Sequence, residues 1–180
     1  MLGFKAELMD GVAMGRALMR VAHEIVEKNK GANDLCLVGI RRRGEPLARI
    51  IRDNIKKIEG VEVPLESVDI KYYRDDLKLT NETPVWGKPD FSIDITGKII
   101  VLVDDVLFTG RTARAAMEAV MTCGRPRAIQ LAVLVDRGHR ELPIRADFVG
   151  KNVPTSRAEL VEVHMPPYDE EMRVCLIDIH

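Results

Sequence analysis

The amino-acid sequence predicts an α/β fold, in which a mostly parallel central sheet has helices on both faces and is accompanied by a flexible β-arm or lid loop. Short aliphatic runs typical of buried strands alternate with segments whose apolar residues recur at helical spacing. Strands that alternate with helices in this way form βαβ units and a parallel sheet. Because no repeat, linker or low-complexity tract interrupts the pattern, residues 1–180 are expected to form a single domain.

The composition narrows the class of protein. Hydrophobic residues make up 46% and charged residues 31% of the 180 positions, as in ordinary soluble chains. With a formal net charge of −1, any surface for nucleic acid must be a local patch. The longest apolar runs, such as residues 129–135, are too short to cross a bilayer, and no export signal opens the chain. Three scattered cysteines suit a reducing compartment, so we expect a cytoplasmic protein without membrane contact.

Residues 10–30 are predicted to form the first helix, and Gly31 is a plausible stop after it. Its apolar face is made by Met14, Leu18, Val21 and Ile25. A second stripe is basic and contains Arg16, Arg20 and His23. The ordinary interpretation is a solvated face that pairs with Glu24 and Glu27, and the alternative is a binding surface.

A basic turn follows the strand predicted at residues 35–40. Arg41, Arg42 and Arg43 stand between two glycines, and residues 45–58 then have a helical pattern. In sheets built from βαβ units, ligands bind at the carboxyl ends of the strands. Arginine can bind phosphate oxygens with two hydrogen bonds at once, so this turn suits a polyphosphate better than a purely solvated role.

Regular structure is lost after the strand predicted at residues 67–72. The segment 73–95 contains Arg74, followed by two acids and then several turn-forming residues. Loops of this length in compact domains are usually lids, binding loops or disordered segments. We expect a lid that excludes water from a neighbouring site, with Trp86 as a packing anchor.

The most informative stretch is residues 101–112. The strand predicted at residues 99–103 leads into Asp104 and Asp105, then a Thr-Gly turn and the start of the helix at residues 111–123. Backbone N–H groups at a helix start attract anions, and Gly110 permits close approach. The paired carboxylates suit ribose hydroxyls or hydrated Mg²⁺. This combination predicts a site for a ribose phosphate.

The remainder of the chain continues the α/β pattern. A strand is predicted at residues 128–135, and a highly charged loop follows at residues 136–145. Two further strands are expected near residues 160–164 and 173–179.

Residues 101–112 resemble the phosphoribosyl-diphosphate (PRPP) binding motif of type I phosphoribosyltransferases, which consists of an aliphatic strand, two acids, two or three residues and Thr-Gly. About nine tenths of the chain further resembles the bacterial family of bifunctional pyrimidine-operon attenuation regulators and uracil phosphoribosyltransferases. The segments that carry this resemblance are residues 20–24, 73–77, 103–112, 130–145 and 150–156.

The resemblance implies the type I phosphoribosyltransferase fold and the reaction of uracil with PRPP to give UMP and diphosphate. Asp104 and Asp105 would be catalytic and hold the ribose hydroxyls directly or through Mg²⁺, which they would bind either directly or through water. Arg74 would close over the diphosphate, which Arg41 and Arg42 would also contact. The implied nucleotide-binding stretch is Val103, Asp104, Asp105, Val106, Leu107, Phe108, Thr109, Gly110, Arg111 and Thr112.

Two positions favour uracil over a purine. The 6-oxopurine enzymes usually have an acid directly before Thr-Gly, where this chain has Phe108. They carry a lysine that donates to the purine carbonyl where this chain has Asp136, which cannot donate in that way. Phe148 and Val149 are expected to flank the base. A purine phosphoribosyltransferase without RNA function is the alternative.

The resemblance also implies that the UMP-bound protein binds a leader mRNA hairpin of a pyrimidine operon. The candidate contacts are Arg16, Arg20, His23, His139, Arg140 and Arg145. A homodimer or higher homo-oligomer would enlarge this patch. Arg140 and Arg145 could instead pair with Glu141 and Asp147. A regulator with only residual catalysis is the remaining alternative.

Overall fold

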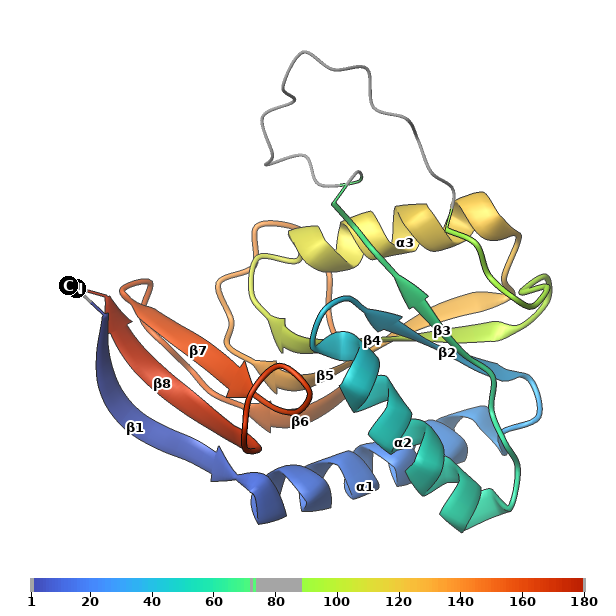
Figure 1. Cartoon of the computed structure of the whole chain (residues 1–180). Helices are drawn as coiled ribbons and strands as arrows, with labels where there is room; N and C mark the ends of the chain where they lie inside the picture. The colour runs from blue at the N-terminus through green and yellow to red at the C-terminus, as the bar shows by residue number, and fades with distance from the viewer. Residues whose placement is uncertain (1, 72, 74–88, 180) are drawn as a thin grey trace.

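The computed structural model describes residues 2–71, 73 and 89–179, and these residues form two sheets and three helices (Figure 1). The larger sheet has five parallel strands in the order β3-β2-β4-β5-β6. In chain order they are β2 (Leu35–Ile40), β3 (Leu65–Val68), β4 (Ile99–Leu107), β5 (Ala128–Asp136) and β6 (Phe148–Asn152). A parallel sheet with helices on both faces confirms the predicted fold class.

The parallel sheet separates the core into two layers, and helices cover both of them. Helices α1 (Gly11–Asn29) and α2 (Gly44–Glu59) pack on one face of the parallel sheet, and α3 (Arg111–Cys123) packs on the other. At the start of α1 the Asp10 side chain accepts a hydrogen bond of 2.7 Å from the Ala13 amide, which satisfies a donor that the helix leaves unpaired. None of the described helices is long and apolar enough to cross a membrane.

Strand β4 lies at the centre of the parallel sheet. It pairs with β2 on one side and β5 on the other, so that Leu102 stands between Val38 and Leu131. All six residues of β2 are buried, as the continuous aliphatic run predicted. Burying each aliphatic side chain stabilises the folded state by about 1.5–3 kcal/mol. The buried strands on either side therefore fix the position of β4.

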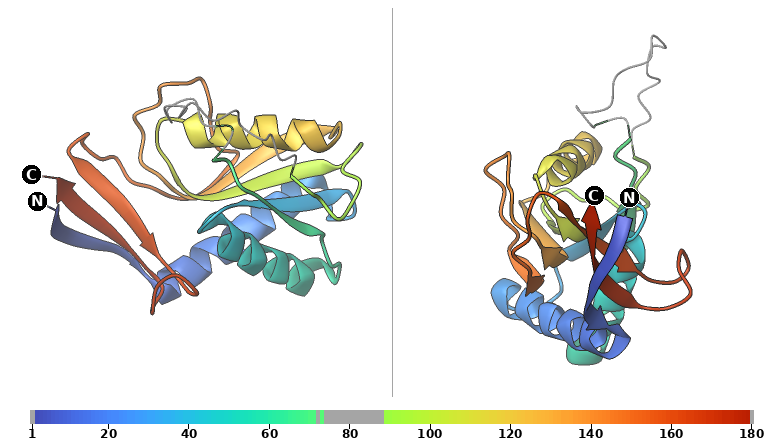
Figure 2. Two further views of the ribbon diagram at one scale, coloured as in Figure 1. Left: turned by 45° about the horizontal axis from the view of Figure 1, so that its top comes forward. Right: turned by 90° about the vertical axis from the view of Figure 1, so that its left-hand side faces the viewer.

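A second, antiparallel sheet has the strand order β1-β8-β7 and lies beyond the carboxyl ends of the parallel strands (Figures 1 and 2). Its strands are β1 (Leu2–Asp10), β7 (Glu159–His164) and β8 (Arg173–Ile179). The two later strands confirm the prediction, whereas β1 was not predicted. Register shifts interrupt the pairing of β1 with β8, which weakens the alternation that marks a strand in sequence.

Several boundaries differ from the sequence predictions. The parallel strand β4 continues to Leu107, because Asp104 and Val106 still pair with β5. Strand β3 occupies residues 65–68 in place of the predicted 67–72, and β6 was not predicted as a strand. Most of the predicted lid, residues 74–88, lies outside the described residues.

Candidate functional site

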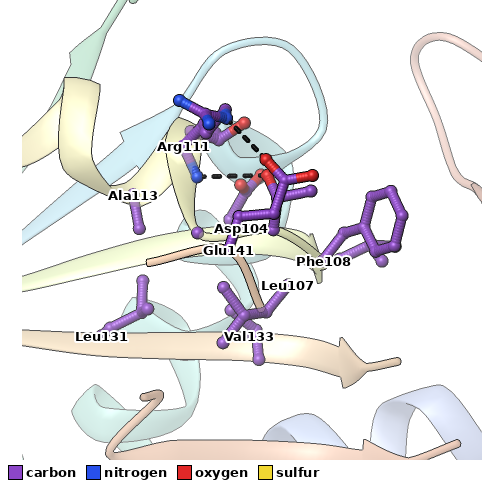
Figure 3. Close-up of a pocket in the computed structure, with 12 residues that line it drawn as sticks. Asp104, Leu107, Phe108, Arg111, Ala113, Leu131, Val133 and Glu141 are labelled. Carbon is purple, nitrogen blue, oxygen red and sulfur yellow. Dashed lines mark hydrogen bonds and ion pairs between the residues drawn. The ribbon is translucent and has the colours of Figure 1, made fainter. Parts of the chain in front are cut away.

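A cavity of about 410 Å³ opens where β4 passes into α3 (Figure 3). The turn depends on Gly110, whose φ of 94° lies in the left-handed region that favours glycine. The cavity is lined by Asp104, Val106, Leu107, Phe108, Thr109, Gly110, Arg111, Thr112, Ala113, Leu131, Val133 and Glu141. The stretch singled out in the sequence therefore forms most of one cavity wall.

The two acids of this stretch lie near the carboxyl end of strand β4. Asp104 lines the cavity, and its carboxylate accepts a hydrogen bond of 2.9 Å from the Asp105 amide. The Asp105 carboxylate accepts one of 2.8 Å from the Val106 amide. Burial, together with the neighbouring Asp105 carboxylate, raises the pKa of Asp104 well above its ordinary value. A cation or a hydroxyl group of a ligand would stabilise the ionised form of this carboxylate.

The charged loop after β5 is bonded to the same turn. Thr109 accepts hydrogen bonds through its carbonyl from the amides of Glu141 (2.9 Å) and Leu142 (3.2 Å). Glu141 also accepts a hydrogen bond of 2.8 Å from Nε of Arg111, and Figure 3 shows these two side chains turned toward one another. The cavity thus has a carboxylate beside its anion-attracting turn.

An aromatic and cationic cluster stands at the cavity rim. The guanidinium carbon of Arg137 lies 4.0 Å from the centroid of the Phe108 ring, which also meets His139 edge-on at 6.0 Å. Arg137 is only 3% exposed. Its guanidinium donates to Oγ1 of Thr155 (3.1 Å) and to the carbonyls of Ser156 (3.1 Å) and Glu159 (2.6 Å). Sequence reasoning did not single out Arg137.

The basic turn lies beside the end of β4 because two glycines let the backbones approach. A Cβ on Gly39 would lie 2.5 Å from the Cα of Glu45, and one on Gly44 would overlap the Val103 carbonyl. Between these glycines Arg41 and Arg42 are exposed, and the peptide bond that joins them is cis. Because β2 and β4 are parallel neighbours, Arg41 and Arg42 after β2 and the acidic pair near the end of β4 lie toward the same edge of the sheet.

The three predicted base contacts lie apart from the cavity wall. The Asp136 carboxylate accepts a hydrogen bond of 3.0 Å from the Gly138 amide and forms an ion pair with Arg140, which shapes the charged loop. Phe148 is buried in the core beneath α1, and Val149 packs against the core on the α3 side. None of the three is among the cavity-lining residues.

The six predicted RNA contacts fall into two groups. Arg16, His23 and Arg145 are exposed, as is Arg20 of the second group. The other three side chains bond to the protein's own backbone: Arg20 to the carbonyls of Val149 and Gly150, His139 to that of Thr155, and Arg140 to those of Phe108 and Ile144. Arg20 also pairs with Glu24, as the solvated-face interpretation expected. Arg74, the predicted lid arginine, lies outside the described residues.

The acidic pair has a donor set that fits Mg²⁺. This cation is usually held by one or two carboxylates together with substrate oxygens and water. Asp104 lines the cavity, and Asp105 is the next residue of the same strand. In the described part of the chain, no group of three or more His, Cys, Asp or Glu side chains could hold a metal ion. The residues therefore fit a cation whose other ligands come from a substrate.

Comparisons with known proteins agree with this geometry. The phosphoribosyl transferase domain family matches residues 6–167. "Bifunctional protein PyrR" of Caldicellulosiruptor bescii is 62% identical over 94% of this chain and 93% of its own length. The protein of that name from Clostridium acetobutylicum is 55% identical over 99% and 100%. Hypoxanthine phosphoribosyltransferase of Trypanosoma cruzi is similar in structure, with a TM-score of 0.74 at 20% identity over 98% of each chain.

Proposed function

The chain belongs to the phosphoribosyltransferase family and to its bifunctional PyrR branch, and on this premise we propose that it converts uracil and PRPP to UMP and diphosphate and regulates pyrimidine genes through RNA. One observation carries the proposal. Asp104 and the anion-attracting turn line one cavity at the end of the central strand, and Asp105 follows Asp104 directly in that strand. Cytoplasmic pyrimidine metabolism suits a chain whose three cysteines are all free.

The chemistry follows from charge placement. The backbone N–H groups of residues 109–112 would bind the ribose 5-phosphate, and Asp104 and Asp105 would hold the ribose hydroxyls. The bond from ribose C1 to the diphosphate oxygen breaks, the bond from C1 to uracil N1 forms, and the N1 proton leaves. The carboxylates offset the positive charge that develops on the ribosyl group, while Arg41 and Arg42 would receive the departing diphosphate.

Magnesium would arrive with PRPP and be held by the same two carboxylates. When bound, it would neutralise part of the negative charge of the diphosphate. Arg74 would contribute a further cation from the lid, as the family resemblance implies.

The identity of the base rests on Phe108 and on the close relatives. Phe108 lines the cavity and has no group for proton exchange with a purine ring nitrogen. The hypoxanthine enzyme that shares the fold is only 20% identical, so it supports the fold alone. The two relatives described above, at 62% and 55% identity, are both named as bifunctional proteins.

The enzymatic proposal is tested by diphosphate release from PRPP and Mg²⁺ with uracil, hypoxanthine, guanine and orotate in parallel. We expect release with uracil. Activity confined to a purine would refute the choice of base, and no release with any base would refute the proposed reaction.

The regulatory half of the proposal concerns a leader mRNA hairpin. Arg16, His23 and Arg145 are exposed and available for phosphate contacts, and a homo-oligomer would repeat this patch. Binding of a pyrimidine-leader hairpin should be tight only with UMP present. Arg145→Gln should weaken it and reduce the salt slope by about 1 without changing uracil turnover. Equal affinity for an unrelated hairpin, with or without UMP, would refute this half.

A further inference from the structure

The turn between β7 and β8 contacts the basic turn that follows β2. The Asp169 carboxylate accepts hydrogen bonds from Arg43, with Nη2 at 3.1 Å from Oδ2 and 3.2 Å from Oδ1 and Nε at 3.3 Å from Oδ2. The adjacent Tyr168 lies under the next arginine, with the guanidinium carbon of Arg42 5.2 Å from its ring centroid. Two consecutive residues of one turn therefore hold two consecutive arginines of another.

Asp169 is fixed on several sides. Its Oδ2 accepts a hydrogen bond of 2.9 Å from the Met165 amide, and its Oδ1 lies 3.3 Å from Nδ1 of His164. Partial burial opposes ionisation, but the Met165 amide and the Arg43 guanidinium outweigh it and hold the pKa of Asp169 below its ordinary value. The carboxylate is therefore ionised at neutral pH, and Arg43 is committed to it.

A contact between Arg42 and the Tyr168 ring does not use the N–H donors of the guanidinium. A guanidinium stacks on an aromatic ring through its face and donates through the N–H groups in its plane. Arg42 is exposed, so these groups can meet an incoming phosphate while the ring limits the conformations of the side chain. Restricting a side chain before binding lowers the entropy that binding costs.

We propose that Tyr168 and Asp169 are positioning residues for diphosphate: Asp169 anchors the basic turn through Arg43, and Tyr168 orients Arg42 toward the leaving group. The inference rests on the proposed function, because it assigns a task within the same reaction. It gives the small antiparallel sheet a role in catalysis, since the turn between two of its strands supplies both residues.

Tyr168→Leu is the first test, with Tyr168→Phe as the conservative variant and Glu170→Gln as an exposed control in the same turn. An exposed cation–π contact has a modest value, so we expect Tyr168→Leu to raise the KM for PRPP and the inhibition constant of diphosphate about two- to fivefold. Its kcat and KM for uracil should stay near those of the unmodified protein. Tyr168→Phe keeps the ring face and should restore both constants.

Asp169→Asn tests the anchor. It removes the charge that holds Arg43, and we expect about a tenfold loss of diphosphate affinity, because a charge-assisted, doubly bonded contact is stronger than an exposed one. Binding of UMP, which carries no diphosphate, should change less than twofold in both variants. This contrast separates positioning of the diphosphate turn from general damage to the fold.

The outcomes distinguish failure of the proposed function from failure of the positioning role alone. If the unmodified protein neither releases diphosphate with uracil nor binds UMP, the proposed function fails. If it does both, but Tyr168→Leu and Asp169→Asn leave the diphosphate and PRPP constants unchanged, the positioning role fails alone. Equal losses of UMP and diphosphate affinity would also overturn it, because the turn would then support the whole site.

Discussion

Nε of Arg111 donates a hydrogen bond of 2.8 Å to Oε2 of Glu141, and both residues line the cavity that we assign to the ribose phosphate. A carboxylate therefore occupies space beside a turn suited to anions. The pair also joins α3 to the charged loop, which carries three of the six RNA contacts predicted from the sequence. Binding of a phosphate at the turn would compete with Glu141 for Arg111.

Glu141→Gln should strengthen binding of phosphate-bearing ligands. It removes a negative charge next to the phosphate position, and a half-exposed ion pair is worth at most about 1 kcal/mol, so we expect UMP affinity to rise up to about fivefold. Titration calorimetry at two salt concentrations measures the change. Uridine, which has no phosphate, is the control, and an equal gain for uridine would contradict the explanation.

Asp105→Asn should lower turnover strongly while leaving the fold intact. The variant keeps the shape of the side chain but loses the negative charge that we propose offsets the positive charge developing on ribose. A loss of about 100-fold or more in kcat is typical when such an electrostatic contact is removed. Diphosphate release gives the rate, and circular dichroism checks the fold. An unchanged rate would remove Asp105 from the mechanism.

Asp104→Asn should make the protein more stable than the unmodified protein, and this difference should grow as pH rises. Because the pKa of Asp104 is raised in the folded state, the folded protein binds this proton more tightly than the unfolded chain does. The free energy of unfolding therefore falls as pH increases above the ordinary value of 3.8, and the contribution is fully present only below it. Urea unfolding of the variant should show greater stability at pH 7 and convergence with the unmodified protein near pH 4.

Arg137→Met should destabilise the protein by about 2–4 kcal/mol, because it removes a buried guanidinium that donates to the carbonyls of Ser156 and Glu159. It should also release Phe108 from the cation–π contact at 4.0 Å. Urea unfolding measures the loss, with the exposed Arg157→Met as a matched control. Equal stability of both variants would show that the hydrogen bonds of Arg137 to Ser156 and Glu159 do not stabilise the fold.

Local signals explain what could be predicted from the sequence. The run from the central strand through Asp104 to Gly110 and α3 is read from neighbouring residues, and the structure places it around one cavity. The face of a strand residue is harder to predict, because a shift of one position reverses it. The strand β6 begins at Phe148, so this side chain packs beneath α1 and does not reach the cavity wall.

Partners distant in the chain could not be predicted. Arg137 stands in a highly charged loop and has the sequence signature of an exposed residue, yet its acceptors lie 18 to 22 positions later. Asp169 and Arg43 are 126 positions apart, and neither residue marks the other in the sequence. Such pairs depend on how the small sheet packs against the parallel one.

The pairing of β1 with β8 has a consequence for the order of biosynthesis. Leu2 aligns with Ile179, so the ribosome must make nearly all of the described chain before these strands can join. The phosphate turn between β4 and α3 involves residues made much earlier. A nascent chain can therefore form the proposed sugar-phosphate pocket before Asp169 is anchored in a finished sheet, and the proposed positioning of diphosphate would be the last property to mature.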